Sequence, residues 1–310
     1  MKLSKKSNLK QKSIVRIFLS GFAMGSADIV PGVSGGTVAL IVGVYEELIA
    51  SIKTVSGEVL RLALKGKILE AFRAIPFRFL IPLAGGLLTA VLTLAKVLEW
   101  LLLNQPVFLW SFFFGLVAAS IFLVGKRVKN WDLKVIVSLV LGAIAAYLIV
   151  GLVPVETPAT IPAYFLSGVI AICAMILPGV SGSFLLIVMG KYSQILSAVS
   201  NKDFIVLGTV GVGAIIGLSL FSRILSYFFE KHHDLMMAIL TGVMLGSLRK
   251  IWPWKEVLET YIDSHGVENP LVEKNILPLA YDQNFFFALL VALAGALIIV
   301  YLSKFDTKDN

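Results

Sequence analysis

The residues of this chain best suited to bind an anion lie in a glycine-rich motif that occurs twice. The first copy is Pro31-Gly32-Val33-Ser34-Gly35, and the second, 147 residues later, is Pro178-Gly179-Val180-Ser181-Gly182. A glycine-rich turn that leads into a helix exposes backbone N–H groups near the positive end of the helix dipole, and phosphates bind at such places. The serines add hydroxyl donors. The residues predicted to bind a phosphate are therefore Gly32, Ser34, Gly35, Gly36 and Thr37 in the first copy, and Gly179, Ser181, Gly182 and Ser183 in the second.

A structural interpretation of the same motif is also open. Pro-Gly-Val-Ser-Gly is a good tight turn, and its serine is a good N-cap for the helix that follows. One copy would leave the two interpretations balanced. Two copies at matching places, each inside a long apolar stretch, favour a binding site, because paired broken segments mark the substrate sites of many transporters.

Charged residues inside apolar stretches are further candidates, because they are costly in a membrane unless they serve a function. Asp28 precedes the first turn, whereas Met175 stands at the matching place before the second. Glu46 and Glu47 end the first broken segment. These three carboxylates are the candidates for proton coupling, since the like charge of a bound phosphate would favour the protonated form of Asp28. The alternatives are that Asp28 binds neighbouring amides and that both glutamates reach water.

Three basic residues are predicted to contact the same phosphate. Lys96 and Arg223 occupy matching positions in the two halves of the chain, and Lys191 follows the second motif. Each has a structural alternative, because a long basic side chain can extend to the nearest membrane surface. His232 and His233 lie in a short polar loop and are interpreted as solvated loop residues, so we expect no metal site and no cofactor.

The elements that hold these residues must lie in a bilayer. Hydrophobic residues make up 58% of the chain, charged residues make up 15%, and the mean hydropathy is +0.90. Soluble domains average about 45–50% apolar and about 25% charged residues. Several runs exceed the roughly 18 apolar residues that cross the hydrocarbon core. The net charge of +8 calls for no nucleic-acid partner, because the basic residues gather in loops where membrane topology would place them.

The spacing of the motif predicts two repeats, residues 1–153 and 154–310, each with a broken hairpin and three transmembrane helices. The first repeat has a hairpin at 14–52, a basic interfacial helix at 53–78, and helices at 79–103, 107–125 and 133–153. The second has a hairpin at 162–200, helices at 204–229 and 235–251, an external loop at 252–284 and a helix at 285–303. The predicted fold is an all-α polytopic membrane protein.

The hairpins are predicted to be re-entrant and the repeats inverted. An arm of about 14–17 residues covers about 21–26 Å, which is less than a hydrocarbon core of about 30 Å. Three spans per repeat is an odd number, so the second repeat must be upside down relative to the first. Lysine and arginine gather in the N-terminal tail, in 53–78 and in 126–134, which places both termini in the cytoplasm. The two turns would then meet near the membrane midplane.

The motif and its surroundings resemble a known family. The segment Gly25-Ser26-Ala27-Asp28-Ile29-Val30-Pro31-Gly32-Val33-Ser34-Gly35-Gly36-Thr37, with Leu177-Pro178-Gly179-Val180-Ser181-Gly182-Ser183, is similar to the polyprenyl-phosphate translocases. The resemblance covers nearly the whole chain. It implies a protein of the bacterial cytoplasmic membrane that returns the lipid carrier undecaprenyl phosphate from the outer to the inner leaflet, for reuse in peptidoglycan and other surface polymers. A small cradle suits its single phosphate, while the prenyl tail stays in lipid.

Two other functions stay open from the residues. Undecaprenyl pyrophosphate phosphatases also have a Pro-Gly-x-Ser turn, but an arginine follows the serine there, whereas Gly35 and Gly182 follow it here. No acidic pair precedes the turn either, so we expect no enzyme. A carrier for a small soluble anion would use the same cradle. Glycines that allow close helix packing, within one copy or between two copies of a homodimer, are Gly208, Gly211, Gly213 and Gly217.

Overall fold

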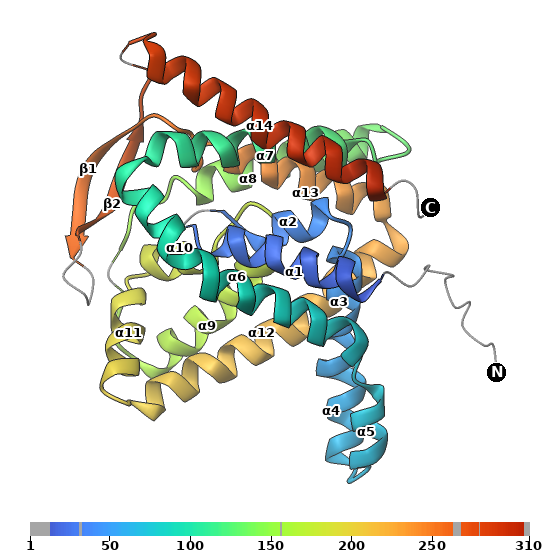
Figure 1. The fold of residues 1–310 in the computed structure, drawn as a ribbon. Helices are drawn as coiled ribbons and strands as arrows, with labels where there is room; N and C mark the ends of the chain where they lie inside the picture. Colours follow the sequence, from blue (N-terminus) through green and yellow to red (C-terminus); the bar gives the residue numbers. More distant parts are fainter. Residues whose placement is uncertain (1–12, 31–32, 156, 263–267, 279, 307–310) are drawn as a thin grey trace.

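The structure, a computed structural model, describes residues 13–30, 33–155, 157–262, 268–278 and 280–306 (Figure 1). The predicted first repeat contains α1 (Ile14–Asp28), α2 (Gly35–Ile41), α3 (Tyr45–Thr54), the π-helical turn η1 (Val55–Val59), α4 (Leu60–Leu64), α5 (Ile68–Ala74), α6 (Phe77–Asn104), α7 (Pro106–Gly125) and α8 (Leu133–Ile149). The second contains α9 (Ile161–Ile176), α10 (Gly182–Val188), α11 (Tyr192–Ser200), α12 (Phe204–Lys231), α13 (His233–Ser247), β1 (Lys255–Ile262), β2 (Glu268–Asn275) and α14 (Gln283–Asp306). The chain is mostly helical, as predicted.

Four helices in the described part of the chain are long and apolar enough to cross a membrane: α6, α7, α12 and the Gln283–Tyr301 part of α14. The pair α10 and α11, bent by 102°, would add a fifth span. Two of the six predicted spans, 133–153 and 235–251, are shorter than expected: α8 has 17 residues and α13 has 15. Asp132 caps the start of α8 through Val135 N–H, and α13 ends before the aromatic segment that leads into the sheet. The structure therefore agrees with a polytopic membrane protein.

The helix boundaries recur with the spacing of the motif. Helices α9, α10 and α11 begin 147 residues after α1, α2 and α3, and α12 and α13 begin 127 residues after α6 and α7. The predicted hairpins 14–52 and 162–200 nevertheless differ from two simple arms, because a second break divides each second arm. Gly43 and Gly190 stand at these breaks with φ of 77° and 65°. Only glycine adopts this conformation without strain, so the helix ends there in both repeats.

Four helix pairs pack with their backbones in contact at glycines. Pairs α1–α6 and α9–α12 each lie within one repeat, whereas α7–α14 and α8–α13 each join a helix of one repeat to a helix of the other. A Cβ at these glycines would collide with the partner's carbonyl: Gly21 with Leu83, Gly168 with Val210, Gly115 with Ala292, and Gly242 with Leu139. The repeats are therefore interlocked. Gly213 and Gly217 pack against α9, while Gly208 and Gly211 have open space where a Cβ would lie.

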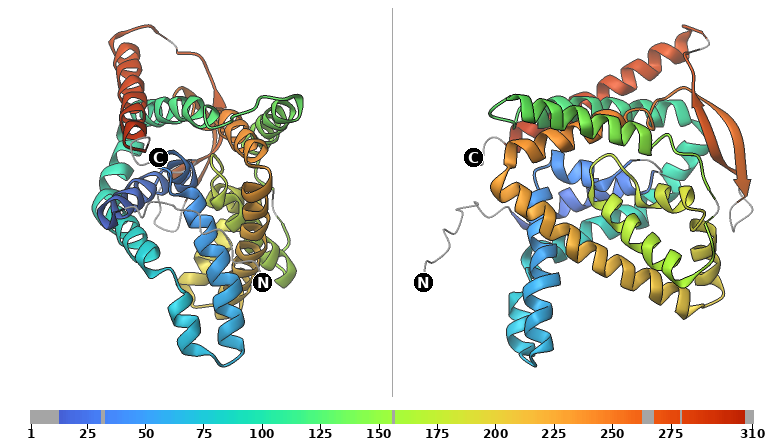
Figure 2. Two further views of the ribbon diagram at one scale, coloured as in Figure 1. Left: turned by 90° about the vertical axis from the view of Figure 1, so that its right-hand side faces the viewer. Right: turned by 180° about the vertical axis from the view of Figure 1, so that it is seen from behind.

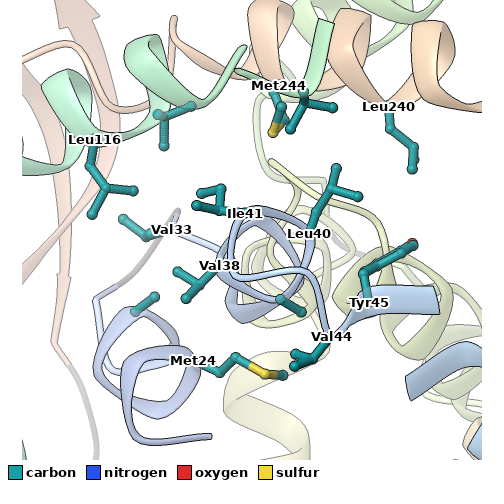
Figure 3. Close-up of a cluster of buried hydrophobic side chains, with 14 of the residues drawn as sticks. Met24, Val33, Val38, Leu40, Ile41, Val44, Tyr45, Leu116, Leu240 and Met244 are labelled. Carbon is teal, nitrogen blue, oxygen red and sulfur yellow. The ribbon is translucent and has the colours of Figure 1, made fainter. Parts of the chain in front are cut away.

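Helix α2 lies in the centre of the molecule, and all seven of its residues are buried. Figure 3 shows side chains of α2, among them Val38 and Leu40, between Met24 of α1, Leu116 of α7 and Met244 of α13. The first glycine-rich turn leads into this helix, so in this conformation the position of the turn depends on packing against α1, α7 and α13.

The segment 53–78, predicted as one basic interfacial helix, is a helical hairpin instead. Helices α4 and α5 are joined at Lys65–Lys67, where Gly66 has a φ of 75° and ends the first helix. The hairpin projects from the helix bundle, at the bottom of both views in Figure 2. The projection agrees with a place at a membrane surface, which remains a prediction.

The loops gather at two ends of the molecule. The sheet, the α6–α7 connection and the start of α14 lie at one end, and the α12–α13 connection lies at the other, near α3 (Figure 1). At this second end Lys53 pairs with Glu230 at 2.8 Å, and Asp234 accepts the backbone N–H groups of Lys129 and Asn130 at 3.2 and 3.0 Å. The loops with the predicted cytoplasmic charge pattern thus lie together. The segment 252–284, predicted as a loop, carries the two-stranded antiparallel sheet at the first end.

The close packing of α8 and α13 predicts that Gly242→Ala destabilises the protein. The new methyl group would collide with the carbonyl oxygen of Leu139, and overpacking of this kind costs about 1–3 kcal/mol. Thermal unfolding in detergent, followed by tryptophan fluorescence, measures the effect. The matched control is Gly211→Ala, where nothing lies near the new Cβ. Equal unfolding temperatures for the two variants would contradict the observed packing.

The contact between α13 and α3 predicts a raised pKa for His233. Its ring nitrogen lies 3.4 Å from Glu46 Oε1, and the hydrogen bond to Glu46 outweighs partial burial, so the pKa rises above its ordinary value of 6.5. The stabilising contribution is then complete below about pH 6.5 and is lost as the pH rises through the raised pKa. Histidine NMR titration should find a lower pKa in Glu46→Gln and no change in Glu58→Gln. An unchanged His233 pKa in Glu46→Gln would remove Glu46 as the cause.

Candidate functional site

The two glycine-rich turns contact each other directly. Thr37 Oγ1 accepts the backbone N–H of Gly179 at 2.7 Å, and the Ser34 hydroxyl donates to the carbonyl oxygen of Leu177 at 3.2 Å. Both side chains are buried. The backbones are also close, because a Cβ at Gly36 would lie 2.6 Å from the carbonyl oxygen of Ile176. The structure therefore brings together the predicted residues of both motifs, although Gly32 lies outside the described residues.

A cavity of about 320 Å³ opens between the turns. Its volume is at the lower end of the range for small-ligand sites, about 300–1,000 Å³. The polar lining consists of Asp28 and Ser34 from the first repeat and Ser181 and Ser183 from the second. Helices α9, α10 and α12 supply most of the apolar lining, which includes Met175 and Ala214, and the turns add Val33 and Val180. Such a cavity can hold a small polar group that hydroxyls recognise.

The two turns differ in how their polar groups are satisfied. In the first, Asp28 Oδ1 accepts the backbone N–H of Gly35 at 2.6 Å. A carboxylate thus already occupies the place where the sequence predicts a phosphate. In the second, Met175 stands at the position equivalent to Asp28, and the Ser181 and Ser183 hydroxyls lie 2.9 Å apart beside the cavity. The second turn therefore offers hydroxyl donors without a competing carboxylate at the equivalent position.

The remaining predicted site residues lie elsewhere. Lys191 is fully buried, and its ammonium group donates to the carbonyl oxygens of Thr157 and Pro158 and to Gln194 Oε1 at 3.0, 2.7 and 3.0 Å. These contacts tie the α8–α9 connection to α11, which favours a structural role. Lys191 is predicted to contact the phosphate, but its ammonium group already donates hydrogen bonds to carbonyl oxygens of the protein.

Lys96 and Arg223 are exposed on α6 and α12, and neither lines the cavity between the turns. The Arg223 guanidinium donates to the carbonyl oxygen of Ser56 at 3.3 Å. Glu46 lies with His233 at the end of the molecule that holds the α12–α13 connection, and Glu47 is its neighbour on α3. The roles predicted for these four residues stay predictions.

A second cluster of charged residues lies under the sheet and was missed at the sequence level. Lys250 and Lys255 both contact Glu273 Oε2, at 3.0 and 3.2 Å. They line a cavity of about 960 Å³ between the sheet, α10, the α6–α7 connection and the start of α14. Strand pairing explains the contact: Glu273 lies opposite Val257, so Lys255 is its diagonal neighbour on the same face of the sheet. The available signal was weak, because the polar and apolar residues of 255–262 come in pairs and do not alternate as in a half-buried strand.

Burial and charge act against each other in this cluster. Burial lowers the pKa of Lys255 to about 8, although the Glu273 carboxylate opposes the change. Burial alone would raise the pKa of Glu273, but the ammonium groups of Lys255 and Lys250 outweigh it and hold that pKa below its ordinary value. The contact between Lys255 and Glu273 is therefore an ion pair at neutral pH. Among the described residues, no group of three or more histidine, cysteine, aspartate or glutamate side chains is placed to hold a metal ion.

Comparison with known proteins identifies relatives of this chain. The family model described as undecaprenyl phosphate translocase-like matches residues 24–269. A polyprenyl-phosphate transporter of Vibrio cholerae is 40% identical over 305 residues, which cover 96% of this chain and 99% of the relative. A second relative of the same name, from Staphylococcus aureus, is 32% identical over 76% of this chain and 85% of its own length. No solved structure matches the chain. The chain is therefore a member of the undecaprenyl phosphate translocase-like family.

Proposed function

We propose that this protein transports polyprenyl phosphate, and that the phosphate head group crosses the membrane through the cavity between the two turns. Both relatives named above are polyprenyl-phosphate transporters. The prenyl chain can remain in lipid, because only the polar head is costly to move through hydrocarbon. The proposal extends to undecaprenyl phosphate in the bacterial cytoplasmic membrane, moving from the outer to the inner leaflet.

One observation carries the proposal: the paired turns place the hydroxyl groups of Ser34, Ser181 and Ser183 beside one cavity of a helical membrane protein. A phosphate monoester carries a charge of about −1.5 to −2 at neutral pH, so a crossing head group needs several donors in place of water. Ser181 and Ser183 line the cavity, and the Ser34 hydroxyl, now on Leu177, would reach a phosphate after a change of rotamer. A charge-assisted hydrogen bond contributes about 1.5–3 kcal/mol. Three such bonds would offset a large part of the cost of dehydration.

Asp28 gives the cavity a means of coupling to protons. A phosphate that approaches the N–H of Gly35 must compete with the carboxylate now bound there. Two anions at one amide repel each other, so binding of the phosphate favours protonation of Asp28 or its displacement. Uptake and release of the proton would then accompany uptake and release of the head group.

Helix directions support the inversion of the repeats. Helix α6 ends and α7 begins at the end of the molecule with the sheet, since Asn104 and Pro106 line the same cavity as Lys255. The equivalent helices α12 and α13 meet at the opposite end (Figure 1). With the positive-inside rule, the sheet would lie outside the cell and both termini in the cytoplasm. Each turn would then be reached from its own side of the membrane.

The interlocked packing limits which parts can move. Helix pairs α7–α14 and α8–α13 join the repeats at Gly115 and Gly242, so the repeats would not rock apart as two rigid halves. Two units remain that could move. One consists of α1, α2 and α6, and the other consists of α9, α10 and α12. We propose alternating access by movement of these two units against the scaffold of α7, α8, α13 and α14.

The packing around the turns also bears on hydrolysis. The phosphatase pattern needs an arginine after the serine, and a Cβ at Gly182 would lie 2.6 Å from the carbonyl oxygen of Ala171. At Gly35 the Asp28 carboxylate occupies the corresponding space. Fixed backbone thus blocks such a side chain at Gly182, and the Asp28 carboxylate would have to move to admit one at Gly35, so the geometry favours transport over phosphoryl chemistry.

The turns predict that the double variant Ser34→Ala/Ser181→Ala flips lipid more slowly. Loss of a hydrogen bond to a charged group should lower the rate about tenfold or more for each serine. The measurement is flipping of fluorescent undecaprenyl phosphate in proteoliposomes, with Ser138→Ala/Ser219→Ala as the control. The hydroxyls of Ser138 and Ser219 donate within their own helices, to the backbone carbonyl oxygens of Lys134 and Ile215.

The same assay separates the rival functions. Release of inorganic phosphate from undecaprenyl pyrophosphate would indicate a phosphatase, and uptake of a water-soluble anion without lipid flipping would indicate a soluble-anion carrier. A double variant that flips at the wild-type rate would exclude the paired turns as the path.

Proton coupling predicts that Asp28→Asn uncouples transport. The asparagine side-chain oxygen still accepts the Gly35 N–H but carries no proton, so flipping should no longer respond to a pH gradient. In the wild type, a proton ionophore should slow flipping several-fold. Glu46→Gln and Glu47→Gln, measured in parallel, test the other two carboxylates. Wild-type flipping that is insensitive to the ionophore would rule out coupling altogether.

A further inference from the structure

The charged cluster under the sheet has an unusual geometry. The ammonium groups of Lys250 and Lys255 converge on a single oxygen, Glu273 Oε2, at 3.0 and 3.2 Å. The side chains of Lys255 and Glu273 are 6% and 13% exposed, and that of Lys250 is 21% exposed. Two cations directed at one carboxylate oxygen could hold a phosphate oxygen in the same place, because both acceptors are anionic oxygens of similar size.

The cluster forms the wall between two cavities. Lys250, Lys255 and Glu273, with Phe184, line both the cavity of about 960 Å³ and a neighbouring cavity of about 680 Å³. The charged residues that line the smaller cavity are Arg249, Lys250, Lys255 and Lys274 against Glu273. Those that line the larger one are Lys250, Lys255, Glu273 and Asp282, and Asp282 already accepts the N–H of Phe285 at 3.0 Å. The lining of the smaller cavity is therefore positively charged, whereas the formal charges that line the larger cavity are balanced.

Aromatic rings lie beside each cation. The Lys255 ammonium lies 4.0 Å from the ring centre of Trp110, and the Lys250 ammonium lies 4.9 Å from that of Phe184. The larger cavity continues over apolar residues at the end of α6, at the start of α7 and in α14, which are Leu102, Leu103, Val107, Phe108 and Phe285. A charged centre with an apolar approach suits a ligand that combines one phosphate with a hydrocarbon chain.

The cluster is also connected to the paired turns. Ser183 lines both the cavity of about 960 Å³ and the cavity between the turns. The next residue, Phe184, contacts Lys250. A head group released from the lysines would therefore meet Ser183 first and Ser181 next, since these two hydroxyls lie 2.9 Å apart.

We infer that the sheet and α10 build a second phosphate site, in which Lys250 and Lys255 bind the head group of a prenyl phosphate before it reaches the paired turns. The inference rests on the proposed function and adds a place where the substrate is first captured. Glu273 acts as an internal competitor that holds the two ammonium groups in place while the site is empty. The phosphate displaces the Glu273 carboxylate, and no covalent bond changes.

Substitutions with opposite expected signs test the site. The probe is farnesyl phosphate, a short prenyl phosphate, bound to the purified full-length protein in nanodiscs and measured by calorimetry. Lys250→Gln should weaken binding about tenfold, because it removes one charge-assisted contact. Glu273→Gln should tighten binding several-fold, because the competitor loses its charge. Lys250→Arg should restore binding, and Lys129→Gln, the same charge change in the α7–α8 loop, should leave it unchanged.

Three outcomes would overturn the site. The first is that Glu273→Gln weakens binding as Lys250→Gln does while both variants unfold at the wild-type temperature, which assigns the cluster a structural role. The second is equal binding of farnesyl phosphate and inorganic phosphate, which assigns the cluster to a free anion. The third is that neither substitution changes the affinity.

Flipping assays keep this inference separate from the proposed function. With the site as inferred, Lys250→Gln raises the lipid concentration needed for half-maximal flipping but leaves the maximal rate close to that of the wild type. Ser34→Ala/Ser181→Ala should lower the maximal rate and leave the half-maximal lipid concentration close to that of the wild type. A wild-type protein that binds farnesyl phosphate through the lysines but flips no lipid would contradict the proposed function and leave the second site intact. Wild-type flipping with an unchanged half-maximal concentration in Lys250→Gln would contradict the second site alone.

Discussion

The hydrogen bond from the Gly179 N–H to Thr37 Oγ1 is the constraint on which the rest of the structure depends. A broken helix inside a membrane exposes backbone donors and acceptors that lipid cannot satisfy, and a buried orphan group costs about 1–3 kcal/mol. Here each turn provides partners for the other, because Thr37 receives the N–H of Gly179 and Ser34 donates to Leu177. Breaks in the two repeats are therefore stable only together. The same contact places hydroxyl groups beside a cavity in the protein interior.

This constraint explains why the helices around the turns pack so closely. Turns that satisfy each other must be held at hydrogen-bonding distance, which requires the supporting helices to approach within backbone contact. Glycines at Gly21 and Gly168 bring α6 and α12 against the helices that precede the turns. The pairs that cross between the repeats, at Gly115 and Gly242, hold the remaining helices as one scaffold. The helices that carry the turns thus form two units beside one scaffold. This arrangement favours movement of the two units over separation of the repeats.

Much of this arrangement was predictable from the sequence, because the doubled motif carries the spacing of the helices with it. The spacing of 147 residues reappears in the starts of α1 and α9. The break within the second arm of each hairpin was missed, although Gly43 and Gly190 stand at equivalent positions of the two repeats. A single glycine within a helical stretch does not by itself predict a helix end, because its φ cannot be read from the sequence. The cluster of Lys255 and Glu273 was missed for another reason. Its residues meet through strand pairing, and their charges in sequence indicate only an exposed loop.

The two places that could receive a phosphate share one feature, an acidic side chain that occupies the anion position while the site is empty. Asp28 accepts the N–H of Gly35 between the turns, and Glu273 accepts both ammonium groups under the sheet. An empty site of buried donors would be destabilising, because unpaired polar groups are costly at low dielectric. With a carboxylate present, binding exchanges one anionic acceptor for another, and the change in free energy is small. A carrier needs this balance, since a substrate bound too tightly at any step along the path would not be released.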